Sequence, residues 1–384
     1  MRRLLLSAGA LRFLDAFVLI GPFYTVMFAE RGLTPAQIGV VLAAWSGMCV
    51  VLEVPCGVLA DRFSRRWLMS VAQLMRCVGF GVWLAFPGFW GFLVGLMLWG
   101  MKSATLSGAF EAAVFDELKA HGREVEYVRV FGRTQAARFA GVLAGALGAG
   151  AAAPLGYDVL IGASIAVGVA AAGAALALPK APRLTATHRG GYFAHLRRGA
   201  AEAARLPGVP GLLIFIAGMQ AVASSLADYW QLFARDVGLP KPAIALFIAA
   251  LSGVGAVAAA QAHRLRALPM KALYVMLTAA GLAVVAAALT YRVWSVGFLL
   301  VYGAILWLVD TNVDARFQHA LRPETRATVA SVKGFANQCG TSLLMLNFGL
   351  IAQGSSYQAA FLGYGVLLAA LGAGYASWAA TRRT

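Results

Sequence analysis

Charged residues are scarce in this sequence. Asp, Glu, Lys and Arg together make up 12% of the 384 residues, whereas hydrophobic residues make up 60%. An ordinary globular domain has about 25% charged residues. So few charges cannot cover the surface of a water-soluble fold of this length, and the high hydrophobic content excludes a disordered chain. The composition indicates a protein that crosses a membrane several times.

Motifs of the common enzyme classes are also missing. The sequence has no Gly-x-x-x-x-Gly-Lys loop for ATP and no His-x-x-x-His pair for zinc. Asp310 and Asp314 are spaced like the aspartates with which membrane prenyltransferases hold magnesium and diphosphate, but a second such motif is absent. The four cysteines fall inside apolar segments, which predicts no structural disulfide. We therefore expect no enzyme activity, no bound metal and no cofactor.

Long apolar runs dominate the chain. Twelve of them are long enough to cross a hydrocarbon layer of ~30 Å as helices of ~20 residues. These runs are residues 5–29, 36–60, 67–87, 89–115, 128–150, 155–178, 211–234, 241–262, 270–290, 294–317, 325–352 and 357–379. They are unbroken and rich in Leu, Ala and Gly, without the alternation typical of barrel strands. The sequence therefore predicts an all-α membrane protein with twelve transmembrane helices.

The longest connection separates the sixth run from the seventh. It covers residues 179–210, is rich in Lys and Arg, and contains a short amphipathic stretch suited to the membrane surface. It predicts an N-terminal bundle at 1–178, a cytoplasmic linker with an amphipathic helix at 179–210, and a C-terminal bundle at 211–384. Leu98-Trp99 is echoed by Leu306-Trp307, as expected for the internal repeats of secondary transporters. We expect two pseudo-symmetric six-helix bundles.

Positive charge is concentrated on one side of the predicted membrane. The net charge is +16, and most of the 32 Lys and Arg residues fall in the connections on the side of the N-terminus. This asymmetry predicts that both termini are cytoplasmic, in a multi-pass protein of the inner membrane. It explains the excess of basic residues without a nucleic-acid partner. The first run contains Arg12 and Asp15 and lacks a small-residue cleavage site, so we expect a retained helix rather than a signal peptide.

One string of residues carries a family resemblance. The stretch from Gly57 to Arg66 reads Gly-Val-Leu-Ala-Asp-Arg-Phe-Ser-Arg-Arg and joins the second and third runs. It resembles the signature loop of the major facilitator superfamily, Gly-x-Leu-Ala-Asp-Arg-x-Gly-Arg-Arg/Lys, with Ser64 in the place of the second Gly. The twelve runs and the central linker fit the same family, so the resemblance covers nearly the whole chain.

The resemblance implies transport by alternating access, with this loop as a latch on the cytoplasmic side. In the family, Asp61 would approach the start of the eleventh helix and Arg65 would pair with Asp116 at the end of the fourth. The residues expected in the latch are Gly57, Asp61, Arg62, Arg65, Arg66 and Asp116. The Arg-centred motif in the fourth helix and the Gly-Pro motif in the fifth, which many drug and proton antiporters carry, are missing. Drug efflux therefore stays open.

Charged side chains inside the apolar runs are the main candidates for function, because a charge facing lipid costs several kcal/mol. By the resemblance, helices one, four, seven and ten line the central cavity. The candidates there for proton coupling or substrate binding are Asp15, Lys102, Glu111, Asp228 and Asp310. Supporting charges are expected at Arg12, Glu53, Arg76 and Arg138. Candidate substrate contacts are Tyr24, Gln220, Tyr229, Trp230, Asn312 and Asn337.

Structural roles compete with these functional ones. Arg12 and Asp15 are one turn apart, a spacing that suits mutual neutralisation. Glu53 is a candidate partner of Arg76 or Arg138 in the scaffold. Asp314 is interpreted as a solvated loop or latch carboxylate.

The sequence thus predicts a proton-coupled secondary transporter that moves a small organic molecule and works as a monomer in the bilayer. Export by antiport is favoured because the signature loop is common among drug exporters. The same residues would serve an uptake symporter for a nutrient or a metal chelate. A membrane receptor or assembly factor built on a transporter scaffold is the remaining alternative.

Overall fold

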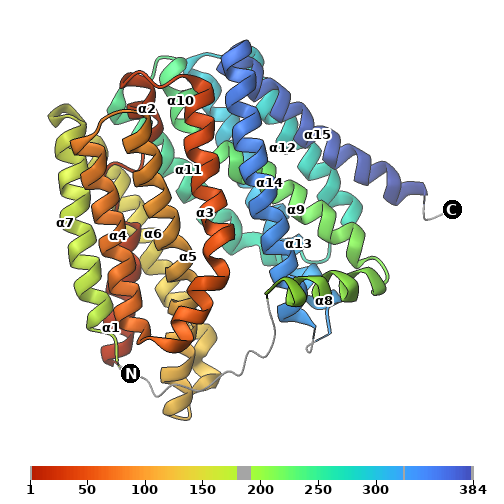
Figure 1. The fold of residues 1–384 in the computed structure, drawn as a ribbon. Helices are drawn as coiled ribbons and strands as arrows, with labels where there is room; N and C mark the ends of the chain where they lie inside the picture. The colour runs from red at the N-terminus through yellow and green to blue at the C-terminus, as the bar shows by residue number, and fades with distance from the viewer. Residues whose placement is uncertain (1, 180–191, 323–324, 382–384) are drawn as a thin grey trace. The chain divides into compact units, whose positions relative to one another are not determined.

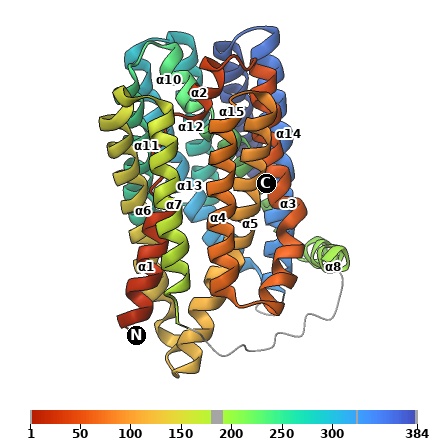
Figure 2. The same cartoon turned by 60° about the vertical axis from the view of Figure 1, so that its left-hand side comes forward.

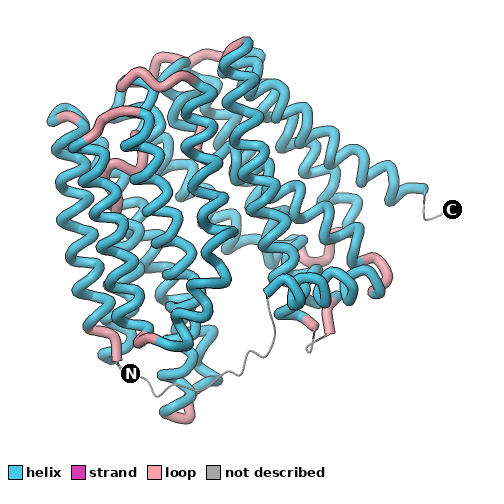
Figure 3. Tube along the Cα trace, in the orientation of Figure 1, coloured by secondary structure: helices cyan, strands magenta, loops and turns pink. Residues whose placement is uncertain are grey.

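The computed structural model describes residues 2–179, 192–322 and 325–381. These parts of the chain are helical, with short turns between helices and no strand among them (Figures 1 and 3). Helices satisfy every backbone N–H and C=O internally, which an apolar surrounding requires. The prediction of an all-α membrane protein is confirmed.

The first half of the chain contains seven α-helices and two 3-10 turns in the described residues. They are α1 (Arg2–Ala16), α2 (Tyr24–Glu30), α3 (Pro35–Arg62), α4 (Arg65–Ala85), α5 (Phe89–Ala120), η1 (Glu124–Glu126), α6 (Tyr127–Ala152), η2 (Ala153–Leu155) and α7 (Tyr157–Leu176).

The second half repeats this arrangement after an additional helix, α8. Its elements are α8 (Tyr192–Arg205), α9 (Val209–Ala227), α10 (Trp230–Asp236), α11 (Lys241–Gln261), η3 (Ala262–Leu265), α12 (Met270–Thr290), η4 (Val293–Ser295), α13 (Val296–Ala320), α14 (Arg326–Gly354) and α15 (Tyr357–Thr381).

Ten helices in the described ranges are long and apolar enough to cross a membrane by themselves. The remaining two of the twelve predicted runs correspond to the pair α1 and α2 and to the 29-residue helix α14. The sequence predicts a single helix for the first run and another for the seventh. In the structure each of these runs is divided into two helices, α1 with α2 and α9 with α10. Two breaks at the same place in the two halves support an internal repeat.

The break between α1 and α2 follows from local chemistry. Pro22 has no N–H and disfavours a helical conformation in Gly21 before it. The freed backbone is partly satisfied by α7, where the Ser164 hydroxyl accepts a hydrogen bond from the Ile20 N–H at 3.1 Å. The second break lies at Asp228 and Tyr229, where Asp228 ends α9.

The signature string is more helical than the sequence suggests. Gly57 to Arg62 belong to the last turns of α3, and α4 begins at Arg65, so that only Phe63 and Ser64 connect the two helices. The helix thus extends two residues beyond the end of the predicted run at 60. Leu, Ala and Arg within the string favour helix, which carries α3 to Arg62.

The chain divides into two compact units. The first unit comprises Met1–Leu33, Val40–His188 and Pro240–Ala249, and the second comprises Thr34–Gly39, Arg189–Leu239 and Ala250–Thr384. The start of α3 thus belongs to the second unit and the start of α11 to the first. The sequence boundaries at 178 and 211 do not foresee this exchange of two helix starts.

Glycines permit both of these exchanged contacts. Within the second unit, a Cβ at Gly39 of α3 would lie 2.9 Å from the Met345 carbonyl oxygen of α14. Within the first unit, a Cβ at Gly150 of α6 would lie 3.3 Å from the Ala245 Cβ of α11. Backbones approach this closely only where side chains are small.

Helix α8 occupies the part of the linker where an amphipathic helix is predicted. It packs against α14, and a Cβ at Gly199 would lie 2.6 Å from the Thr328 carbonyl oxygen. The preceding linker residues, 180–191, lie outside the described parts of the chain.

In the first unit, α4 packs between α5 and α7, and α1 packs between α6 and α7 (Figure 2). Leu11, Met69, Phe110 and Val114 form part of its core, each with 0% exposure. The closest approach of α4 to α5 is at Gly79 and Gly95. A Cβ at Gly79 would lie 2.6 Å from the Gly95 carbonyl oxygen.

Gly79→Ala should therefore destabilise the protein. Its methyl group would push α4 from α5, and overpacking of this kind costs about 1 to 3 kcal/mol. The matched control is Gly81→Ala on the same helix, where no atom lies within 4 Å of the added Cβ. Thermal unfolding in detergent measures both. Equal melting temperatures for the two variants would show that this contact is not tight.

Candidate functional site

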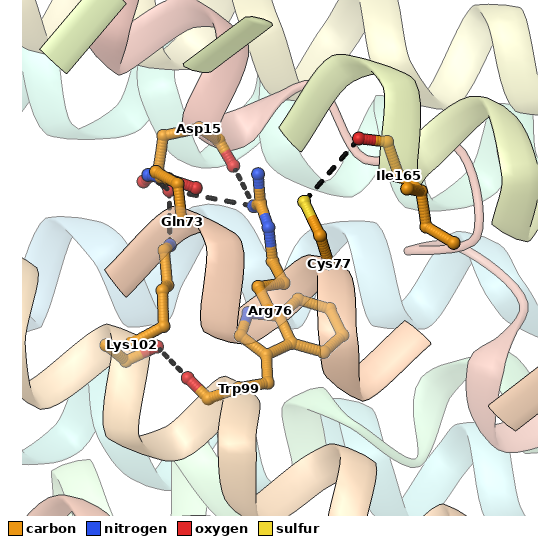
Figure 4. Close-up of polar contacts among 8 residues, drawn as sticks. Asp15, Gln73, Arg76, Cys77, Trp99, Lys102 and Ile165 are labelled. Carbon is orange, nitrogen blue, oxygen red and sulfur yellow. Dashed lines mark hydrogen bonds and ion pairs between the residues drawn. The ribbon is translucent and has the colours of Figure 1, made fainter. Parts of the chain in front are cut away.

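Four polar side chains from three helices meet at the end of α1 (Figure 4). Asp15 lies in the last turn of α1, Gln73 and Arg76 lie one turn apart on α4, and Lys102 lies on α5. The Gln73 amide nitrogen donates to Asp15 Oδ1 at 2.8 Å, and Arg76 Nη1 lies 3.6 Å from the same oxygen. Lys102 Nζ forms an ion pair with it as well. We call these four residues the Asp15 cluster.

The Asp15 cluster is almost inaccessible. Asp15 is 8% exposed, Lys102 5% and Arg76 1%. Arg76 Nη1 also donates to the Asp15 backbone carbonyl at 2.7 Å. The carbonyls of the last helical turn lack partners within the helix, and a cation is favourable there. Arg76 therefore caps α1 at its break in addition to pairing with Asp15.

These contacts bear on one structural alternative from the sequence. Among the described residues, Arg12 is not at ion-pair distance from Asp15, and its Nη2 donates to Gln135 Oε1 of α6 at 2.5 Å. The Arg12 guanidinium also lies over the Phe110 ring, 4.7 Å from its centroid. Arg76 pairs with Asp15. The side chain of Glu53, the other partner considered for Arg76, lies outside the described part of the structure.

Two other candidate charges of the first half are more accessible than the Asp15 cluster. Glu111 on α5 and Arg138 on α6 are both exposed. Exposure to water is one of the ways in which a charge in an apolar run avoids the cost of facing lipid.

The second unit also has a carboxylate with a polar partner from another helix. Asp310 is half-buried on α13, and its Oδ1 accepts a hydrogen bond from the Gln220 amide nitrogen of α9 at 2.8 Å. One turn further along α13, Asp314 forms an ion pair with Lys333 of α14. Asp314 thus lies within a helix rather than a loop, and its partly exposed side chain links α13 to α14 within the second unit.

Several candidate substrate contacts are core residues in the structure. Tyr229 stacks on Phe348 with centroids 3.9 Å apart, and its hydroxyl donates to the Met345 carbonyl at 2.8 Å. Trp230 stacks on Phe361 at 5.3 Å. Asn312 donates to the Ala262 and Leu308 carbonyls, both at 2.9 Å. Packing and backbone hydrogen bonds account for these three side chains.

The other candidates have mixed surroundings. Tyr24 is buried and packs edge-on against Trp99 at 5.8 Å. Asn337 is half-buried, and its Oδ1 accepts a hydrogen bond from the Thr341 hydroxyl at 3.4 Å. Gln220 is half-buried and donates its hydrogen bond to Asp310. Asp228 is half-buried at the end of α9. Gln220 is therefore the candidate that the structure links directly to a charged group.

The motif end of the first unit contains a further ion pair. Arg65 at the start of α4 forms a hydrogen bond and ion pair with Asp116 of α5, and their side chains are 18% and 9% exposed. This is the pairing expected from the resemblance. Arg66 is half-buried, whereas the side chains of Gly57, Asp61 and Arg62 lie outside the described part of the structure.

A further polar group lies at the end of the first unit opposite to the Arg65–Asp116 pair, and the sequence gives no indication of it. Glu30 Oε2 accepts hydrogen bonds from the Tyr157 hydroxyl at 2.8 Å and from Lys241 Nζ at 2.9 Å. Lys241 also lies over the Tyr157 ring, 4.2 Å from the centroid. Lys241 lies here because the first residues of α11 pack within the first unit. The sequence near Lys241 contains no signal for this long-range contact.

Gln73 is also missed, although it has a signal. It is an amide in an apolar run, one turn from Arg76. Among the described residues, no group of three or more His, Cys, Asp or Glu side chains is placed to hold a metal ion.

The charge balance of the Asp15 cluster predicts unequal effects of two substitutions. Asp15→Asn leaves Arg76 and Lys102 without an anion, which should destabilise the protein by about 3 to 5 kcal/mol. Lys102→Met leaves one cation with one carboxylate and should cost less than Asp15→Asn. Melting temperatures in detergent compare them, with the exposed Asp158→Asn as a control. A larger loss for Lys102→Met than for Asp15→Asn would contradict this charge balance.

Comparison with known proteins identifies the family. The sequence profile of the Major Facilitator Superfamily matches residues 5–345. Among curated proteins, the chain is 29% identical over 133 residues to the inner membrane transport protein YajR of Escherichia coli (strain K12), which covers 35% of this chain and 27% of that protein.

Solved transporter structures share the fold. The nucleoside transporter NupG has a TM-score of 0.79 at 14% identity, covering 97% of this chain and 98% of that chain. A bacterial homolog of the human lysosomal transporter Spinster, in an inward-facing and unoccupied conformation, has a TM-score of 0.76 at 17% identity, covering 97% and 95%. With the profile match across most of the sequence, this shows that the chain is a multi-pass secondary transporter that belongs to the Major Facilitator Superfamily.

Proposed function

We propose that the protein is a proton-coupled transporter of a small organic molecule and that Asp310 is the residue that takes up the coupling proton. The observation that carries this proposal is the difference between the buried Asp15 and the half-buried Asp310. Asp15 has two cationic partners, whereas Asp310 accepts a hydrogen bond from a neutral amide and has no cation at ion-pair distance among the described residues. A buried carboxylate without a counter-ion is costly when ionised, and a proton removes that cost.

Gln220 suits both states of Asp310. The amide nitrogen donates to the ionised carboxylate, as in the structure. When Asp310 carries a proton, the same amide turned over presents its oxygen as the acceptor. The neighbouring carboxylate Asp314 is neutralised by Lys333. These contacts support Asp310, rather than Asp314, as the residue whose charge changes during coupling.

The proposal includes the direction of transport, the oligomeric state and the membrane. We propose export by antiport, since the signature string is common among drug exporters, from a monomer in the inner membrane with both termini in the cytoplasm. In vesicles with an imposed pH gradient, antiport moves substrate against the proton flow and symport moves it with the flow. Absence of gradient-driven movement for any stabilising compound would favour a receptor or assembly factor instead.

Asp310→Asn should abolish proton-driven transport. Asparagine keeps the size of the side chain and its hydrogen bond to Gln220 but cannot carry the proton. Accumulation of a compound found by thermal stabilisation should fall to background in vesicles, while exchange at equal pH persists. The control Asp158→Asn, in an exposed pair with Arg31, should transport normally. Normal accumulation in Asp310→Asn would refute the assignment.

The Arg65–Asp116 pair should influence conformation rather than protonation. Removing a charge-assisted hydrogen bond of ~1 to 3 kcal/mol shifts a two-state equilibrium about tenfold. We expect Arg65→Gln to change the labelling of engineered cysteines from the two membrane sides while leaving the pH dependence of transport unchanged. A shifted pH profile with unchanged labelling would argue against a latch.

A further inference from the structure

The Asp15 cluster contains more buried positive than negative charge. Lys102 and Arg76 contribute two cations, whereas Asp15 is the anion that pairs with them. All three residues are less than a tenth exposed. An uncompensated charge at such a depth is costly, which makes an additional anion favourable here.

The hydrogen-bond donors of the Asp15 cluster also exceed its acceptors. Arg76 Nε and Nη2 are buried and have no hydrogen-bond partner among the described residues. Lys102 has three N–H groups, and among the described residues its side chain pairs with Asp15. A ligand rich in acceptors, such as a carboxylate, complements this arrangement.

Arg12 extends the same imbalance along α1. It lies one turn before Asp15, on the same side of the helix. Its contacts are the neutral Gln135 amide and the Phe110 ring, and its Nε is buried without a hydrogen-bond partner among the described residues. No carboxylate lies at ion-pair distance from Arg12 in the described part of the chain.

We propose that Lys102 binds the anionic group of the transported molecule and that this molecule is an organic carboxylate. The inference rests on the proposed transport function and names its substrate class. Arg76 is held in place by its bond to the Asp15 carbonyl, which leaves it as a fixed support. Lys102 has a flexible side chain and freely directed N–H groups, so it is the cation able to change partners.

The surroundings of Lys102 favour an aromatic acid. Trp99 lies one turn before Lys102 on α5 (Figure 4). Its ring is half-buried and packs edge-on against Phe80 at 5.2 Å and against Tyr24 at 5.8 Å. An aromatic ligand with a carboxylate at Lys102 would contact this group.

Asp15 acts as the internal competitor of the ligand. Its carboxylate holds Lys102 while the ligand is absent, and a bound carboxylate takes over that ion pair. Replacing Asp15 by Asn removes the competitor and leaves both cations in place. Asp15→Asn is therefore expected to bind carboxylates more tightly than the native protein, although it is less stable without them.

The test measures melting temperatures of the purified full chain in dodecyl maltoside, an uncharged detergent that contributes no anionic headgroup. The probes are benzoate, phenylacetate and indole-3-acetate at constant ionic strength, each compared with its neutral amide. At least one carboxylate should raise the melting temperature of the native protein saturably, while its amide does not. Lys102→Gln should weaken the apparent affinity about tenfold or more, because a charge-assisted bond is lost.

Two variants separate binding from a structural effect. Lys119→Gln removes an exposed lysine in the last turn of the same helix and should keep the native response. Asp15→Asn should respond at lower carboxylate concentration than the native protein. A response equal for acids and amides, or one retained by Lys102→Gln, overturns the proposal. So does the absence of any carboxylate response in both native protein and Asp15→Asn.

Vesicle transport distinguishes this inference from the proposed function. If a pH gradient drives a neutral or cationic compound and no carboxylate binds, the proton-coupled transporter stands and the carboxylate site is wrong. If carboxylates bind through Lys102 but no gradient moves them, the site stands and proton coupling is wrong.

Discussion

A charge inside an apolar helix bundle needs an opposite charge, a hydrogen-bond partner or water, and both units are arranged around this requirement. In the first unit, Asp15 satisfies it with Arg76 and Lys102, which come from two other helices. In the second unit, Lys333 satisfies Asp314 across α13 and α14. Because the partners belong to different helices, each pair also fixes how its helices pack. Hydrophobic burial alone gives little such specificity between surfaces that are all apolar.

The helix break after α1 depends on the same group of side chains. A helix that ends inside the bundle leaves carbonyl oxygens without partners, which is tolerated only where other groups supply them. Arg76 donates to the Asp15 carbonyl, and Ser164 accepts from the Ile20 N–H on the far side of the break. The Arg76 guanidinium thus compensates a side-chain charge and a backbone end together. This explains why an arginine with 1% exposure is stable at this position.

The sequence predicts the helical fold, the linker helix and the pairing of Arg65 with Asp116, because these depend on apolar run length, amphipathic pattern and a specific motif. It also finds most charges of the two sites, since any charge in an apolar run is unusual. It fails on their partners. Arg12 and Asp15 have a spacing that suits an ion pair, yet Arg12 contacts Gln135, 123 residues away. Such contacts follow from the packing of distant helices, as does the exchange of the α3 and α11 starts.

Asp15 and Asp310 differ in what a proton would do to each. Two cations and an amide stabilise the ionised form of Asp15, so protonation there would leave two buried positive charges without an anion. Asp310 contacts the Gln220 amide, which can donate to the ionised carboxylate or accept from the protonated one. Protonation of Asp310 therefore removes a charge without the loss of a hydrogen bond. A coupling residue must change its charge at low cost, whereas a recognition site must keep its charge constant. The first condition fits the contacts of Asp310 and the second fits the Asp15 cluster, which is why we propose coupling in one unit and recognition in the other.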